Sequence, residues 1–119
     1  MTELLYWSMI AAFFTHELDA VKRHEWRILP LVSRLPEKTA EQVFIWAHVP
    51  IVLGIVWLSR SGAETPFTLG LSVFAMVHVV LHWAFRTHAA NEFTGIGSWA
   101  IIVLAGACGA AHLAASLWN

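Results

Sequence analysis

The sequence has little of several things on which other classes of protein depend. Cysteine occurs once, at Cys108, which excludes a disulfide framework or a thiolate metal cluster within one chain. Only 13% of the 119 residues are charged and the formal net charge is −1, so no nucleic-acid partner is indicated. A glycine-rich phosphate loop and a nucleophile elbow are also lacking, which leaves nucleotide binding and serine hydrolysis without support.

Apolar sequence is abundant instead. Hydrophobic residues make up 58% of the chain, and its mean hydropathy is +0.63. Four apolar runs approach the roughly 20 residues that a bilayer-spanning helix needs, and prolines, glycines and charges separate them. They predict an all-α, polytopic membrane protein in which residues 1–119 form one domain, a four-helix transmembrane bundle. The expected spans are 4–26, 41–58, 67–88 and 96–118.

The basic residues are distributed unevenly between the two ends of this predicted bundle. Arg60 alone lies at one end. The six at the other end are Lys22, Arg23, Arg27, Arg34, Lys38 and Arg86. Because cytoplasmic loops carry an excess of lysine and arginine, we expect that end to be cytoplasmic and both termini to lie outside. The expected location is the bacterial cytoplasmic membrane, with the lipid bilayer as the immediate partner.

Five ionisable side chains interrupt three of the apolar runs. They are His16, Glu17, His48, His78 and His82. Counting about 1.5 Å per residue from the cytoplasmic helix ends places all five about 9 to 15 Å deep. A charged side chain inside a bilayer costs about 2.5–3.5 kcal/mol on insertion scales, so such residues usually persist for function. The sequence therefore predicts a buried polar site shared by three spans.

The spacing of the histidines favours a metal site. His78 and His82 are four residues apart on one helical face, a common way to offer two imidazoles to a metal. We expect His16 and His48 to complete the ligand set, with Glu17 as an added ligand or a catalytic general base. Such ligands suit zinc or iron. Zinc would imply hydrolysis, and iron oxidation, of a lipid-like or other apolar small molecule.

Further polar residues surround this layer. Asp19 is three residues from His16 and is expected to accept its second ring N–H. Arg23 shares a helical stripe with His16, and Arg86 continues the row of the two histidines on the third span. A second polar layer is expected at the cytoplasmic mouth, where a solvated run of charges is the plainer interpretation. That layer comprises His24, Glu25, His88, Asn91 and Glu92.

A family resemblance is carried by the segment HELDAVKRHEWR at 16–27, by Pro30 and by the histidine pair of the third span. Together these resemble small bacterial integral-membrane proteins named for an H-x-x-E-E motif. Asp19 and Ala20 stand where that motif has two glutamates, so only His16 and Asp19 carry over. The resemblance implies a small polytopic architecture with a polar site, and it implies no particular activity.

Three other functions remain open. A haem electron-transfer protein would use His48 and either His78 or His16 as axial ligands. A proton or metal-ion carrier would use the inner layer as a transit site, and a non-catalytic membrane subunit would use it only to hold helices together. The small residues of the fourth span permit close helix packing and allow a homo-oligomer. They are Ala105, Gly106, Gly109 and Ala110.

Overall fold

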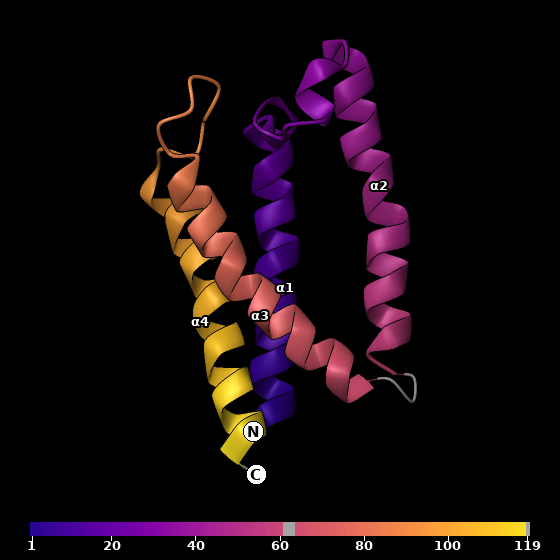
Figure 1. Ribbon diagram of the computed structural model, residues 1–119, viewed down its shortest axis with the longest axis vertical. Coiled ribbons are helices and arrows are strands. Elements are labelled where there is room, and N and C mark those ends of the chain that lie inside the picture. Colours follow the sequence, from indigo (N-terminus) through magenta and orange to yellow (C-terminus); the bar gives the residue numbers. More distant parts are fainter. Residues whose placement is uncertain (61–63, 119) are drawn as a thin grey trace.

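The computed structural model describes residues 1–60 and 64–118, and all the regular structure in that part of the chain is helical. The four long helices are α1 (Thr2–Lys22), α2 (Glu37–Leu58), α3 (Glu64–Ala84) and α4 (Ile96–Trp118). Two single turns of 3₁₀ helix, η1 (Glu25–Arg27) and η2 (Val32–Arg34), join α1 to α2. The prediction of an all-α, four-helix bundle is confirmed (Figure 1).

The helix ends differ from the expected spans at three of the four helices. α1 ends at Lys22 instead of continuing to residue 26, because His24 adopts a left-handed conformation with φ 53° and ψ 46°. α3 ends at Ala84, four residues early, and α2 begins directly after Pro36. A proline can precede the first turn of a helix without loss, since the N–H it lacks has no partner there. These shifts matter most at His24, where the chain turns back toward the bundle.

α1, α3 and α4 pack closely, and small residues make that packing possible. Gly109 of α4 has no room for a side chain. An added Cβ there would lie 2.9 Å from the Cβ of Ala75, 2.9 Å from the carbonyl oxygen of Ser72 and 3.2 Å from Sδ of Met9. The backbone of α4 therefore touches α3 and α1 directly, as small residues in membrane helices permit.

α2 lies on the other side of α1 from α4 (Figure 1). It is joined to the rest of the bundle by side chains rather than by close backbone packing. Near one end, Tyr6 and Ser59 share a hydrogen bond, and near the other the rings of Trp26 and Phe44 lie 5.7 Å apart. Side-chain contacts therefore connect α2 to the rest of the bundle near both of its ends.

Three helices, α2, α3 and α4, are long and apolar enough to cross a membrane. α1 is more polar, because Glu3, His16, Glu17 and Asp19 interrupt its apolar sequence. Large apolar side chains are exposed along the outer faces, among them Trp46, Leu53, Val80 and Trp83. Water would not favour so much exposed apolar surface, whereas a lipid bilayer covers it.

Candidate metal centre

Three imidazoles from two helices converge at one point inside the bundle. His16 comes from α1, and His78 and His82 come from successive turns of α3. Each offers a ring nitrogen, and these three nitrogens lie within 4.8 Å of one another. The two Nε2 atoms on α3 are 3.1 Å apart, and the ring of His16 stands edge-on to both, with centroid distances of 4.8 Å.

This spacing suits a metal ion. Nitrogen ligands lie about 2.0–2.1 Å from zinc, so two ligands of a tetrahedral site are separated by about 3.3 Å. The pair on α3 already has nearly that separation, at 3.1 Å.

His16 is the most informative member of the cluster. Its side chain is 1% exposed, and within the described residues neither of its ring nitrogens has a hydrogen-bond partner. Leaving a buried polar group without a partner costs about 1–3 kcal/mol. A cation held between the three rings would satisfy one nitrogen of each.

A carboxylate faces the same point. Glu25 is 8% exposed, with Oε2 lying 3.5 Å from Nε2 of His16 and Oε1 lying 3.7 Å from Nε2 of His82. Glu25 was expected at the mouth, but the left-handed turn at His24 directs it inward. Burial raises the pKa of Glu25, but the neighbouring imidazoles, His16 first and then His82, more than offset burial and leave this pKa below its usual range.

Glu17 and His48 were expected in the same ligand shell, but the structure pairs them with each other. Nε2 of His48 lies 2.7 Å from Oε2 of Glu17, and Nδ1 of His48 lies 2.7 Å from the carbonyl oxygen of Phe44. Adjacent residues of a helix differ by about 100° around its axis, so His16 and Glu17 face different neighbours. His16 faces α3 and Glu17 faces α2.

The residues expected to orient the imidazoles make other contacts. Oδ1 of Asp19 accepts a hydrogen bond from Nε of Arg23, at 3.3 Å, and not from His16. Arg86 does not continue the row of histidines into the site. Its guanidinium lies 3.7 Å from the ring centroid of Trp83 and donates to that residue's carbonyl oxygen at the exposed end of α3.

Ion pairs at the mouth hold together the loops at this end of the bundle, and we call them the clamp: His24, Arg27, Glu37 and Glu92. Glu92 binds both His24, at 2.9 Å, and Arg27, at 3.0 Å, and Arg27 also binds Glu37 at 2.9 Å. The hydrogen bond that Arg27 donates to Glu37, together with the negative charge of Glu37, raises the pKa of Arg27. His88 and Asn91 form turn contacts within the loop after α3, where the Nδ1 of His88 accepts from the backbone N–H of Ala90. The clamp joins that loop to η1 and to the start of α2.

Phe93 covers the centre and was not found by sequence analysis. The side chain is 2% exposed, and its ring centroid lies 4.7 Å from that of His82 and 5.6 Å from that of His16. A single phenylalanine in a loop has no periodic neighbours that could mark it as buried. Its position shields the imidazoles from water at the end where the clamp lies.

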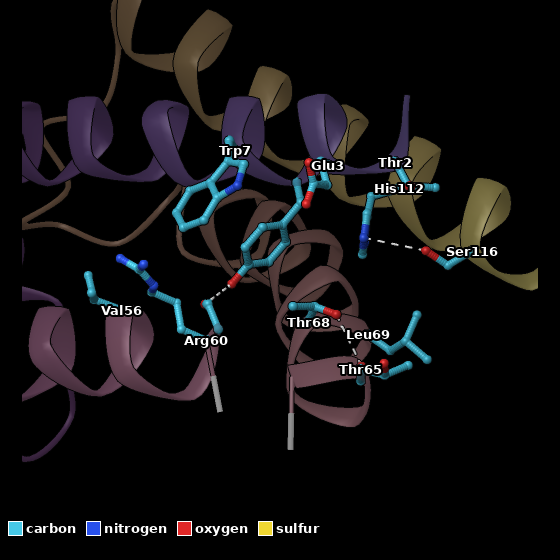
Figure 2. Close-up of a pocket in the computed structure, with 12 residues that line it drawn as sticks. Thr2, Glu3, Trp7, Val56, Arg60, Thr65, Thr68, Leu69, His112 and Ser116 are labelled. Carbon is cyan, nitrogen blue, oxygen red and sulfur yellow. Dashed lines mark hydrogen bonds between the residues drawn. The ribbon is translucent and has the colours of Figure 1, made fainter. Parts of the chain in front are cut away.

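Among the residues that the structure describes, cavities lie at two different levels of the bundle. A cavity of about 600 Å³ opens at the end that carries both termini (Figure 2). It is lined by His112, whose ring bonds to the hydroxyls of Ser72 and Ser116. A cavity of about 140 Å³ lies between α1, α2 and α3 and is lined in part by Glu17, His48 and His78. The smaller cavity borders the three-imidazole cluster through His78.

Known proteins supply no activity for this centre. No curated protein and no solved structure matches the chain. A protein-family model does match, over residues 2–119, and so takes in α1, α3 and Glu25, which together carry the cluster. Its description is "Family of unknown function (DUF6713)". Because the match extends over nearly the whole sequence, the chain belongs to the DUF6713 family.

Proposed function

We propose that the chain is a membrane-embedded, metal-dependent enzyme whose divalent ion is held by His16, His78 and His82, with Glu25 as the fourth ligand. The observation that carries the proposal is the buried ring of His16, which makes no hydrogen bond within the described residues and faces two other imidazoles and the carboxyl group of Glu25. Three nitrogen ligands and one oxygen ligand suit zinc or iron. Elemental analysis decides between these two ions.

A purely structural hydrogen-bond network accounts less well for the same arrangement. A neutral imidazole has one donor nitrogen and one acceptor nitrogen, so three such rings need at least three acceptors for their donors. His78 and His82 can share one hydrogen bond, but His16 has none among the described residues. A single cation bound by one nitrogen of each ring would supply the interactions that these imidazoles lack.

The surroundings support catalysis rather than storage of an ion. A bound zinc ion would polarise a carbonyl group for hydrolysis, and a bound iron ion would support oxidation. The Glu17–His48 pair lines the cavity beside His78 and can accept or supply a proton there. The apolar walls of that cavity favour an apolar substrate.

We further propose that the centre lies near the cytoplasmic side of a bacterial inner membrane, with both termini outside. The support is the distribution of charge. Six of the seven lysines and arginines lie in or beside the connections at the clamp end of the bundle, whereas Arg60 lines the cavity at the opposite end. Labelling of single cysteines placed at Thr2 and at Ser33 in intact cells tests this orientation.

Metal analysis of detergent-purified protein tests the function. We expect about one metal ion per chain in the parent. It should be lost in His16→Ala, His78→Ala and His82→Ala and retained in the control variants His112→Ala and His88→Ala. Should an alanine variant fail to fold, His82→Gln keeps the size of the side chain. Equal metal content in every variant would reject these ligands, and a Soret band lost in His48→Ala would assign the imidazoles to haem instead.

A further inference from the structure

The cavity of about 140 Å³ between α1, α2 and α3 has one polar end and otherwise apolar walls. Its polar side chains are Glu17, His48 and His78. The apolar ones come from all three helices and are Phe13, Phe14, Ile51, Val52, Ile55, Leu71 and Phe74. A ligand that fits must therefore be mainly hydrocarbon, with a polar group at one end.

The size of the cavity limits the ligand further. An apolar cavity of roughly 150 Å³ stays dry and accepts a molecule the size of benzene, about six carbon atoms. A volume of about 140 Å³ thus holds a short length of one hydrocarbon chain, and neither a sterol ring system nor two acyl chains side by side. Ile51 and Phe74 line the cavity and are half exposed on the outer surface of the bundle. The rest of a longer chain can therefore extend past them into lipid.

Hydrogen bonding at the polar end selects the head group. The carbonyl oxygen of Phe44 can only accept a hydrogen bond, so Nδ1 of His48 carries a proton and donates a hydrogen bond to that oxygen. The 2.7 Å contact between His48 Nε2 and Glu17 Oε2 then contains one proton shared by the pair. Within the described residues, the other carboxyl oxygen of Glu17 has no hydrogen-bond partner. A head group with an O–H or N–H can donate to it.

The head group would then lie beside the metal centre. His78 lines this cavity and also belongs to the three-imidazole cluster. Phe13 and Phe74 pack against its ring, with centroid distances of 5.4 and 5.7 Å, and so continue the apolar wall up to the cluster. A polar group hydrogen-bonded to Glu17 would therefore be separated from the proposed ion only by the side chain of His78.

We propose that the substrate is a single-chain amphiphile with a hydroxyl or amide head group, whose chain lies between α1, α2 and α3 and whose head bonds to Glu17. Its role as a substrate rests on the proposed function, whereas its binding does not. The ligand enters from the lipid phase past Ile51 and Phe74, which lie at the exposed edge of the cavity.

Photolabelling of the detergent-purified protein with a long-chain alcohol that carries a diazirine in its chain tests the proposal. We expect labels on residues that line the cavity. Val52→Phe fills the cavity and should abolish those labels, while Val103→Phe, on the exposed face of α4, should leave them unchanged. Excess unlabelled single-chain alcohol should compete, and a sterol or a two-chain phospholipid should not. Labels spread evenly over all lipid-facing residues would overturn the proposal.

A comparison of two photoreactive probes tests the contact between the head group and Glu17. A photoreactive alkane of equal length lacks the donor, so it should label the cavity less than the alcohol does, and Glu17→Gln should reduce that difference. Equal labelling by the two probes in the parent would refute the contact with Glu17. Metal content, measured on the same samples, separates the two proposals. Cavity labels without metal would reject the metalloenzyme alone, and metal without cavity labels would reject the amphiphile alone.

Discussion

His16 and Glu25 are nine positions apart in the sequence, yet Nε2 of the first lies 3.5 Å from Oε2 of the second, and both side chains are buried. In a continuous α-helix, nine residues would separate them by about 13 Å along the axis. The left-handed conformation of His24 ends α1 and turns η1 back over the bundle. One backbone conformation therefore adds a carboxylate to the three imidazoles.

Replacing Glu25 by Gln should weaken metal binding while preserving the fold. Glutamine has the same shape but lacks the charge that offsets the cation. Loss of a group that only orients a ligand typically costs about 10–100-fold in metal affinity, so loss of a ligating carboxylate should cost at least that much. Titration of the metal-free protein with zinc, followed by calorimetry, measures the change. Glu3→Gln, at the exposed start of α1, is the matched control. An unchanged zinc affinity in Glu25→Gln would remove Glu25 from the ligand set.

A methyl group added to Gly109 should destabilise the bundle. The new Cβ would lie 2.9 Å from both the Ala75 side chain and the carbonyl oxygen of Ser72, and neither can rotate away. Overpacking of this kind costs about 1–3 kcal/mol. Thermal unfolding in detergent measures the effect of Gly109→Ala.

Gly54 provides the control for that substitution. It lies in α2, where an added Cβ meets no atom within 4 Å. Gly54→Ala should be neutral or stabilise the helix by about 0.5–1 kcal/mol, because alanine loses less backbone entropy on folding. If both substitutions lowered the unfolding temperature equally, backbone contact at Gly109 would not explain its role.

The helices were predictable because their signal is local. Long apolar runs identify α2, α3 and α4, and the four-residue spacing of His78 and His82 places two imidazoles on one face of α3. Counting residues for depth placed His16 at the level of that pair. Each of these inferences needs only the geometry of one straight helix.

The rest of the site depends on relations that no single helix determines. Which neighbour a side chain meets is set by the rotation of each helix about its axis, and this rotation pairs Glu17 with His48 rather than with the cluster. The inward position of Glu25 depends on a left-handed residue that is not glycine, for which the sequence carries no turn signal. Asp19 has a closer partner in Arg23, one turn along the same helix.

Phe93 should control access to the centre. It is the apolar cover between the imidazoles and the clamp, and removing a buried phenylalanine side chain costs about 3–5 kcal/mol. Phe93→Ala should therefore lower the unfolding temperature and also speed the removal of bound metal by a water-soluble chelator. Phe93→Leu refills most of the volume and should restore stability while leaving part of the faster removal. Trp46→Ala, at an exposed position on α2, should change neither property. If Phe93→Ala lost stability but released metal at the parental rate, the ring would be a packing residue, and the chelator would have to reach the ion by another route.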